Sequence, residues 1–437
     1  METKRRKIVI IGGGFAGIAA ANKLKDSDVD ITIIDKSNHY LFQPLLYQVA
    51  TAALSPGDIA APIRAILGKN SKVRVLLGEV KEIHPKEKFV NLISGREIRF
   101  DQLILAPGAQ YNYFGNEAWK EYAPSLKTIG DALNIRERIL LSLEEAEQLE
   151  DPASRQAHLT YVIIGGGPTG VEMAGAIAEI AGRSMRKSYK NVSENEIRIF
   201  LVEAAPDILN GFPEPLSKKG RQMLEKLGVK ILRNTSVVNI TKNKVHLKVG
   251  SIESSNIIWA AGIKASPLLN SLHVEQDRSG RVIVNKDLSI PNFSDIFVLG
   301  DAAHLKDETG KPLPALASVA IQQGKFVGKL LAKNPAALKR RPQFRYKNRG
   351  TMATIGRAKA VADIKGLKFS GFFAWFLWST VHILLLIGFR NRLHVFVEWV
   401  WNYFTRKRGV QLITDRSGCK QCKPLQFPKQ KLMKELV

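Results

Sequence analysis

The same glycine-rich motif occurs twice in this chain of 437 residues. The first copy, residues 12–17 (Gly-Gly-Gly-Phe-Ala-Gly), follows the apolar run 8–11, and the second, residues 165–170 (Gly-Gly-Gly-Pro-Thr-Gly), follows the apolar run 161–164. A Gly-x-Gly-x-x-Gly motif between a buried strand and a helix is typical of dinucleotide-binding units. One copy alone is a weak signal, because tight strand-to-helix turns are often rich in glycine. Two copies in the same setting predict two such units.

A second landmark repeats at the same distance. Apolar runs that end in Ala-x-Gly occur in both halves, and their last residues, Gly108 and Gly262, lie 96 and 97 positions after Gly12 and Gly165. A chain of this length is too long for one compact core. We therefore expect an α/β fold with two Rossmann-like dinucleotide-binding domains. In each of them a pyrophosphate would lie at the N-terminus of the helix that follows the glycines.

Within each motif the three glycines of the Gly-x-Gly-x-x-Gly pattern have different tasks. The first permits the tight turn out of the strand, the second lets the backbone approach the pyrophosphate, and the third lets helix and strand pack closely. The candidate contacts are Gly12, Gly14, Phe15, Ala16 and Gly17 in the first unit, and Gly165, Gly167, Pro168, Thr169 and Gly170 in the second.

Each unit also carries an acidic residue at the end of its next apolar strand. Asp35 lies 18 residues after Gly17, near the expected spacing of about 20 residues, and Glu203 lies 33 residues after Gly170. A longer helix and the polar loop 191–196 account for the excess. A carboxylate at this place accepts hydrogen bonds from ribose hydroxyls and repels a 2′-phosphate, so Glu203 predicts NADH rather than NADPH. The alternative is a solvated strand end.

A third landmark distinguishes the two nucleotides. Residues 294–303 form a short apolar strand that ends in Gly300-Asp301 ahead of a helical stretch. This arrangement resembles flavoproteins that bind two dinucleotides, in which such an aspartate holds a hydroxyl of the FAD ribityl chain. The resemblance implies FAD in the first unit, to which the chain returns near residue 285, and NADH in the second.

Over about residues 7–415 the sequence resembles the type II NADH dehydrogenases, which are single-chain, non-pumping NADH:quinone oxidoreductases. The glycine motifs are shared by many flavoprotein reductases. The combination of residues 320–324 (Ala-Ile-Gln-Gln-Gly) with the tryptophan-rich C-terminal region is typical of a much narrower set of proteins. The family usually has alanine where this chain has Ile321. The other segments that carry the resemblance are 12–17, 42–50 (Phe-Gln-Pro-Leu-Leu-Tyr-Gln-Val-Ala), 165–175, 259–262 and 300–301.

The resemblance implies non-covalently bound FAD, NADH as the hydride donor and a quinone as the acceptor, with no metal site. Glu172 matches the family's acid near the contact between nicotinamide and flavin; the alternative is a helix N-terminal carboxylate stabilised by the helix dipole. Gln322 and Gln323 would line the junction between flavin and quinone. The further residues implied for FAD are Asp35, Lys36, Gln43, Pro44, Leu45, Val80, Ala106, Gly108, Gly300 and Asp301, and Gly262 is added to Glu203 for NADH.

The C-terminal region contains two apolar segments. Residues 371–388 include no charged side chain, and residues 393–404 place apolar side chains on one helical face. Three interpretations compete: a membrane span, a helix buried in the core, and a pair of helices that lie in the membrane interface, which we favour. The face of the second segment consists of Leu393, Phe396, Val397, Val400, Trp401 and Phe404.

The formal net charge of +25 also points to a membrane surface. Basic residues cluster at 339–349, 390–392 and 406–408, beside the apolar segments, and no nucleic-acid-binding motif is present. The apolar run at the N-terminus is too short for a signal peptide, so we expect a peripheral protein on the cytoplasmic face of the cell membrane, with anionic lipids as partners. The C-terminal helices could also form a homodimer.

The chain has only two cysteines, Cys419 and Cys422, which excludes a disulfide framework and favours a reducing compartment. We assign them no role. Because residues 1–418 contain no cysteine, the sequence also argues against sulfide:quinone oxidoreductases, which need cysteines close to the flavin.

These predictions divide the chain into an FAD-binding domain (1–117 and 283–335), an NADH-binding domain (118–282) and a C-terminal membrane-anchoring region (336–437). Two other functions stay open: a soluble NADH-dependent reductase of ferredoxin or rubredoxin, and a membrane-tethered NAD-binding redox sensor. The sequence leaves undetermined the quinone (menaquinone or ubiquinone), the oligomeric state, the order of the half-reactions and the proton source.

Overall fold

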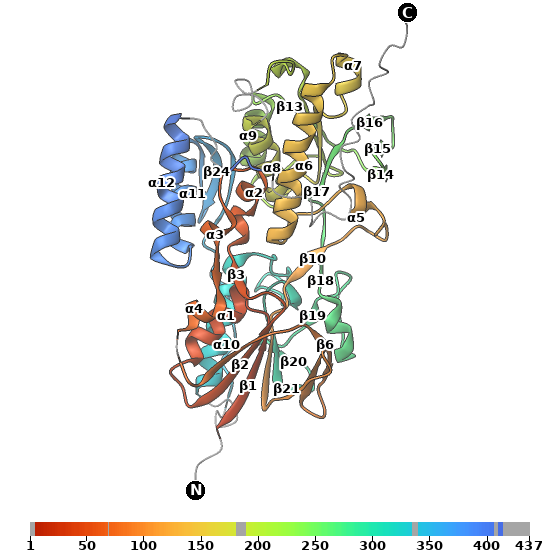
Figure 1. Ribbon diagram of the computed structural model, residues 1–437. Coiled ribbons are helices and arrows are strands. Elements are labelled where there is room, and N and C mark those ends of the chain that lie inside the picture. The colour runs from red at the N-terminus through yellow and green to blue at the C-terminus, as the bar shows by residue number, and fades with distance from the viewer. Residues whose placement is uncertain (1–4, 69, 181–188, 334–339, 406–409, 414–437) are drawn as a thin grey trace, which may run out of the picture.

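The computed structural model describes residues 5–68, 70–180, 189–333, 340–405 and 410–413. Two α/β units lie one above the other in Figure 1, and a C-terminal unit lies along one side of the upper one. Cys419, Cys422 and the basic cluster 406–408 lie outside the described residues.

The first unit is built on a six-stranded sheet in the order β20-β21-β9-β1-β2-β5. β1 pairs in parallel with β2 and β9, β2 with β5 and β21 with β9, while the edge strand β20 is antiparallel. Residues 8–11 of β1 are buried, as expected of a continuous apolar run in a parallel sheet covered on both faces. The bounds are β1 (Arg6–Ile11), β2 (Val29–Asp35), β5 (Val73–Leu77), β9 (Gln102–Leu105), β20 (Ser289–Ile290) and β21 (Phe293–Val298).

Helices α1 and α10 pack against each other beside this sheet (Figure 1). A Cβ at Gly324 of α10 would lie 2.2 Å from the carbonyl oxygen of Ala16 of α1, so the two backbones touch. The helices and short turns of this unit are α1 (Phe15–Leu24), η1 (Gln43–Leu45), α2 (Leu46–Ala50), α3 (Pro56–Ile59), α4 (Ile63–Leu67), η5 (Gly300–Ala302) and α10 (Ala317–Ala332).

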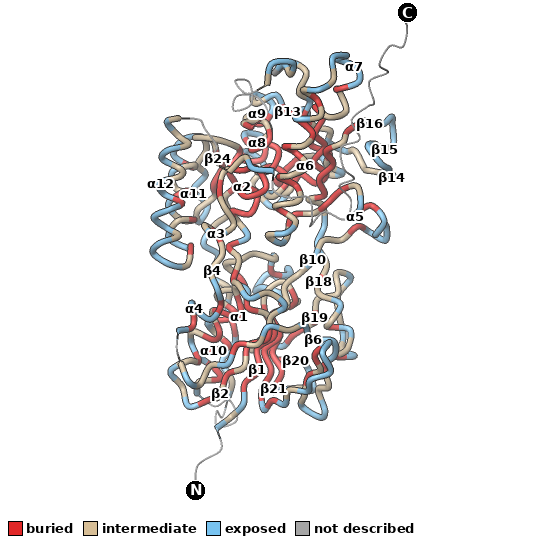
Figure 2. The backbone as a smooth tube through the Cα atoms, in the orientation of Figure 1, coloured by how far each residue is buried: buried red, intermediate tan, exposed pale blue. Residues whose placement is uncertain are grey.

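The second unit repeats the plan with a four-stranded parallel sheet in the order β13-β12-β11-β17. Its buried strands form the red core of the upper unit in Figure 2. The bounds are β11 (Thr160–Ile164), β12 (Arg198–Val202), β13 (Val229–Leu232), β17 (Asn256–Trp259), α5 (Trp119–Tyr122), α6 (Ile129–Gln148), α7 (Pro152–Arg155), α8 (Pro168–Glu179), η3 (Glu194–Glu196) and α9 (Glu214–Glu225).

Each unit inserts a three-stranded antiparallel meander just before its Ala-x-Gly strand. The repeat in the sequence is therefore a repeat of the order of the sheet strands and the meander, while the connection between the second and third strands differs: it contains η1 and α2 to α4 in the first unit and α9 in the second. The meanders are β6 (Val80–His84), β7 (Phe89–Leu92) and β8 (Glu97–Arg99) in the first unit, and β14 (Val237–Thr241), β15 (Lys244–Leu247) and β16 (Ser251–Glu253) in the second.

Two chain crossings connect the units and pair with each other. β10 (Ala109–Tyr111) is antiparallel to β18 (Ile263–Ala265). Directly after β18, η4 (Pro267–Leu272) packs on β6 of the first unit, and the Ser271 hydroxyl accepts a hydrogen bond from the Ile83 N–H at 3.2 Å. Residues 267–272 thus contact the first unit before the return near residue 285 that the sequence suggested. β19 (Val282–Ile283) and β22 (Ala303–His304) then form a short parallel pair.

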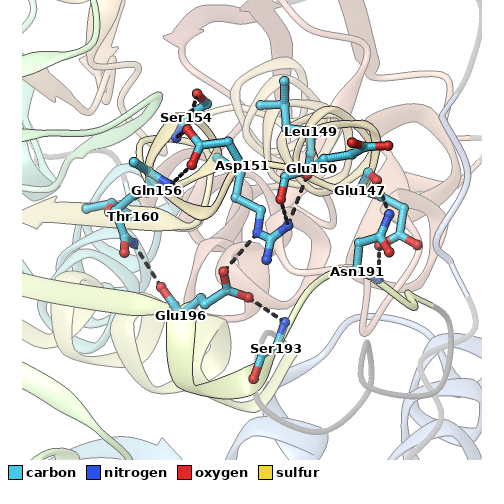
Figure 3. Close-up of polar contacts among 12 residues, drawn as sticks. Glu147, Leu149, Glu150, Asp151, Ser154, Gln156, Thr160, Asn191, Ser193 and Glu196 are labelled. Carbon is cyan, nitrogen blue, oxygen red and sulfur yellow. Dashed lines mark hydrogen bonds and ion pairs between the residues drawn. The ribbon is translucent and has the colours of Figure 1, made fainter.

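A polar network fastens the loop that lengthens the second unit (Figure 3). Arg155, at the end of α7, donates to Glu196 Oε1 at 2.8 Å and to the carbonyl oxygens of Leu149 and Glu150 at 3.0 and 3.2 Å. Beside it, the Glu147 carboxylate accepts two backbone N–H groups of residues 190–191 at 2.8 and 2.9 Å. These bonds hold the stretch before β12, at whose end Glu203 lies.

The C-terminal unit contains a three-stranded antiparallel sheet, β23 (Thr351–Gly356), β24 (Lys359–Ile364) and β25 (Leu367–Gly371), which the sequence analysis did not predict. α11 (Phe372–Leu385) and α12 (Phe389–Thr405) follow, and α11 packs on β24. The unit touches both halves of the protein, because β23 contacts α8 and α12 contacts α3. Its outer helix α12 is largely pale blue, hence exposed, in Figure 2.

The contact between β23 and α8 depends on Gly175. A Cβ at this position would lie 1.8 Å from the Ile355 carbonyl oxygen, so Gly175→Ala has to displace the C-terminal sheet. We expect Gly175→Ala to lower the thermal unfolding midpoint by several degrees, since overpacking costs about 1–3 kcal/mol. Gly211→Ala is the matched control, because a Cβ at Gly211 meets no atom within 4 Å. Equal midpoints for the two variants would contradict this account of the contact.

Candidate active site: two nucleotide loops and a cavity beside the C-terminal helices

The first glycine loop has the geometry that its motif predicts. Gly12 has φ +100°, and a Cβ there would lie 2.2 Å from the Ala106 carbonyl oxygen. A Cβ at Gly17 would lie 1.9 Å from the Gly12 carbonyl oxygen, whereas one at Gly14 meets nothing within 4 Å. Gly14 is the N-cap of α1, and no side chain caps the helix there. The first N–H groups of α1 therefore have no side-chain cap, and the backbone at Gly14 is open to a close approach, which suits a phosphate.

The second loop repeats these features. Gly165 has φ +111° and lies against the backbone of Ala260, and a Cβ at Gly170 would lie 1.8 Å from the Gly165 carbonyl oxygen. Gly167 is the uncapped N-cap of α8, with no atom within 4 Å of a Cβ, and Pro168 occupies the first helical position. Both units thus offer the same open helix N-terminus, which fits the pyrophosphate of a dinucleotide.

The two acidic residues make equivalent hydrogen bonds within the protein. Asp35 Oδ2 accepts the Gly13 N–H at 2.6 Å, and Glu203 Oε2 accepts the Gly166 N–H at 2.5 Å. The second oxygen of each carboxylate accepts a backbone N–H two residues further on, at 2.6 Å for Ser37 and 2.7 Å for Ala205. Each acid therefore ties the glycine loop to the strand end. A carboxylate oxygen accepts more than one hydrogen bond, so lone pairs remain for ribose hydroxyls.

The other residues predicted for FAD surround the first loop. The ring of Phe15 contacts those of Tyr40 and Phe42 at centroid distances of 5.4 and 6.0 Å, which places α1 against the turn η1 that contains Gln43, Pro44 and Leu45. Ala106 lies beside Gly12, Ala16 beside Gly300, and Val80 is buried at the start of β6, while Lys36 is exposed. Gly108 and Gly262 have φ +70° and +67°, just before the crossings β10 and β18.

Asp301 and Gln323 meet at the turn η5. Gln323, 1% exposed, accepts the Gly300 N–H on its Oε1 at 2.6 Å. Asp301 Oδ2 lies 3.8 Å from Nζ of Lys127, which comes from the segment before α6. Gln322 exchanges two hydrogen bonds of 3.0 Å with the backbone of Lys347. Gln323 thus holds the Gly300-Asp301 turn, and Gln322 holds the strap that leads into the C-terminal unit.

A cavity of about 460 Å³ lies where α2, α8, β23, α11 and α12 meet. Elements of both α/β units and of the C-terminal unit form its wall, and neither Gln322 nor Gln323 lines it. Polar and aromatic side chains of its lining include Tyr47, Gln48, Glu172, Trp378, Trp399 and Asn402.

Glu172 is the acid in this wall. Burial raises the pKa of its carboxyl group to about 8, although the group accepts a hydrogen bond from the Thr354 backbone N–H. The pKa rises because desolvation penalises the charged form. At neutral pH Glu172 is therefore mostly a neutral carboxylic acid, which can donate a hydrogen bond or a proton into the cavity.

The sequence analysis missed several polar and aromatic residues of the cavity. The Trp399 indole N–H donates to Gln48 Oε1 at 2.8 Å, and Gln48 Nε2 donates to the Tyr47 hydroxyl at 2.7 Å. Trp378 stacks on both Trp399 and His382, and burial lowers the pKa of His382 to about 4. Gln48 and Tyr47 belong to the segment 42–50 that carried the family resemblance. Polar residues within an otherwise apolar helical segment were therefore the sequence signal that could have indicated a site there.

The six apolar residues predicted on one face of the second C-terminal segment are all exposed. Their exposed fractions run from 41% for Val400 to 77% for Phe404. This contradicts a helix buried in the core of the chain. Within the described part of the chain, no helix is both long and apolar enough to cross a bilayer.

Comparisons with known proteins agree with this architecture. Residues 6–324 match the family model described as pyridine nucleotide-disulphide oxidoreductase, and residues 348–408 match the NDH2 C-terminal domain. Among curated proteins, the chain is 41% identical to the type II NADH:quinone oxidoreductase Ndh of Mycobacterium tuberculosis, over 95% of this chain and 92% of that protein. It is 30% identical to an internal alternative NAD(P)H-ubiquinone oxidoreductase of Arabidopsis thaliana, over 92% and 85% of the two chains.

Solved structures share the fold. NDH2 from Plasmodium falciparum, solved in complex with NADH, superposes with a TM-score of 0.86 at 22% identity, over 93% of this chain and all of that one. A sulfide:quinone oxidoreductase from Aquifex aeolicus gives a TM-score of 0.72 at 18% identity, over 92% and 96% of the chains. On the family models and the curated relatives, this chain belongs to the type II NADH:quinone oxidoreductases, within the pyridine nucleotide-disulphide oxidoreductase family.

Proposed function

We propose that this protein is a flavoprotein that oxidises NADH and reduces a quinone without pumping protons. Two relatives in its own family are named type II NADH:quinone oxidoreductases. The observation that supports it most directly is the cavity, because one wall comes from the nucleotide helix α8 and another from the exposed apolar helices α11 and α12. Bound FAD supplies the two-electron chemistry that connects a hydride donor with a quinone.

FAD would bind non-covalently to the first unit, residues 1–117 and 283–335. The open N-terminus of α1 suits its pyrophosphate, and Asp35 and Asp301 suit its hydroxyl groups. Gln323 would keep Asp301 in place through its hydrogen bond to Gly300. The residues proposed to contact FAD remain Gly12, Gly14, Phe15, Ala16, Gly17, Asp35, Lys36, Gln43, Pro44, Leu45, Val80, Ala106, Gly108, Gly300 and Asp301.

NADH would bind the second unit, residues 118–282, with its pyrophosphate at the N-terminus of α8. Glu203 would accept hydrogen bonds from the adenosine ribose and exclude the 2′-phosphate of NADPH. The proposed contacts are Gly165, Gly167, Pro168, Thr169, Gly170, Glu203 and Gly262. No base is needed for hydride transfer, so these residues act by position alone.

The quinone head group would enter the cavity from the side of α11 and α12. Glu172 lines the cavity as a neutral acid and is suited to supply a proton as the quinone is reduced. Gln322 and Gln323 stay candidates for the junction between flavin and quinone, with Gln323 acting on the Gly300-Asp301 turn.

Residues 336–437 would anchor the protein on the cytoplasmic face of an anionic membrane. The exposed face of α12 would enter the lipid, and Arg390 and Arg392, both exposed, would bind headgroups. The same helices are candidates for a homodimer contact. A soluble ferredoxin- or rubredoxin-type reductase would have no use for this face.

Purification in detergent tests the assignment of cofactor and substrates. We expect a yellow protein with stoichiometric FAD that oxidises NADH with a short-chain quinone, and a colourless or weakly flavinated Asp301→Ala variant. Full FAD occupancy in Asp301→Ala would show that the flavin site is misassigned. Equal rates with NADPH would contradict the role of Glu203.

The raised pKa of Glu172 gives a pH test. Because the neutral acid is present below about pH 8 and is lost above it, quinone reduction should fall as the pH rises through 8. Glu172→Gln should lower kcat with quinone by roughly a hundredfold, as for the loss of a general acid, and should remove this pH dependence. Reduction of ferricyanide, which needs no proton, is the control. An unchanged pH profile in Glu172→Gln would refute the proton role.

The membrane assignment is tested by Phe396→Asp combined with Trp401→Asp. Burying each new charge costs several kcal/mol, so the double variant should become soluble while NADH still reduces ferricyanide. Val238→Asp with Val249→Asp is the matched control, because these valines are 58% and 89% exposed in the second unit. It should still sediment with membranes. The anchor is excluded if the first pair also sediments after a salt wash.

A further inference from the structure

A hydrogen bond between α12 and α2 joins two parts of the chain that are far apart in sequence. It joins the Trp399 indole N–H to Gln48 Oε1, two residues 351 positions apart, at 2.8 Å. Both residues line the cavity, and Gln48 is only 8% exposed. A helix of the exposed apolar surface therefore touches the polar interior of the candidate quinone site directly.

This bond determines which way the carboxamide of Gln48 points. An indole N–H is a donor only, so the atom that faces Trp399 must be the carbonyl oxygen of Gln48. The amide nitrogen then has to face the other way, where it donates to the Tyr47 hydroxyl at 2.7 Å. Without the indole donor, the amide could turn over, because a tyrosine hydroxyl donates as readily as it accepts.

In this orientation Gln48 still has one amide hydrogen to give. Its oxygen is engaged by Trp399 and one N–H by Tyr47, and no acceptor for the second N–H is found among the described residues. A quinone head group carries two carbonyl oxygens, which accept hydrogen bonds and donate none. A buried amide N–H at the cavity wall is therefore suited to one of them, and such a bond strengthens as negative charge develops on that oxygen.

We infer that Trp399 is a positioning residue for the quinone site: its indole N–H fixes the Gln48 carboxamide so that the amide nitrogen is presented to a quinone oxygen. The inference rests on the proposed quinone reduction. Gln48 is the group that would touch the substrate, and Trp399 acts through it. Stacking on Trp378, at a centroid distance of 5.4 Å, fixes the position of the Trp399 ring.

Trp399→Phe tests the inference because phenylalanine keeps an aromatic ring against Trp378 and removes only the donor. We expect the KM for a short-chain quinone to rise and kcat/KM to fall roughly three- to tenfold, the effect of one neutral hydrogen bond. The rate with ferricyanide and the sedimentation with membranes should stay within twofold of wild type. Trp119→Phe is the matched control, since it removes an equivalent bond, from indole N–H to Asn239 Oδ1 at 3.0 Å, in the second unit.

A double-mutant cycle with Gln48→Met separates positioning from a general effect on the fold. If Trp399 acts through Gln48, adding Trp399→Phe to Gln48→Met should change the quinone kcat/KM by less than twofold. Independent, multiplicative effects would overturn the inference, as would a Trp399→Phe variant that behaves like Trp119→Phe or one that also loses ferricyanide activity. Wild-type protein that reduces ferricyanide but no quinone would instead overturn the proposed function on which the inference rests.

Discussion

One face of α8 joins the C-terminal unit to the second nucleotide-binding unit. This face accepts backbone N–H groups from the edge strand β23 and the residue after it. Glu172 accepts the N–H of Thr354, Gly175 leaves room for the Ile355 carbonyl oxygen, and Glu179 accepts the N–H of Arg357. The three positions are spaced three and four residues apart, so they form one stripe on the helix. An edge strand would otherwise expose unpaired N–H groups. The cavity exists because this seam places β23 and the helices behind it next to α8.

The repeated part of the fold was accessible from the sequence because its signals are local. The backbone approaches too closely for a side chain at four glycines, Gly12, Gly17, Gly165 and Gly170, which are recognisable from a short motif. The buried parallel strands are recognisable as continuous apolar runs. The exposed face of α12 was predicted for the same reason, since helical periodicity needs no knowledge of distant contacts. The type of each of these elements therefore follows from local steric constraints and from the periodicity of apolar residues.

The site was harder to predict because its parts are remote in sequence. The cavity wall combines residues near 48, 172, 354 and 399, and no local pattern connects them. The strands β23 to β25 are short and interrupted by turns, which conceals the sheet that brings Thr354 to Glu172. Asp35 and Glu203 were expected to serve a ribose, and their bonds to Gly13 and Gly166 became visible only in three dimensions.

The contacts between the units have a mechanical consequence. The paired crossings β10 and β18 connect the two α/β units, and α2 of the first unit packs on α6 and α8 of the second. The C-terminal unit bridges the same two units, because β23 contacts α8 on one side and α12 contacts α3 on the other. Any rotation that separates the units must break one of these contacts. These contacts oppose any change in the distance between the two nucleotide loops, which favours substrate entry into an already assembled site over closure of an open one.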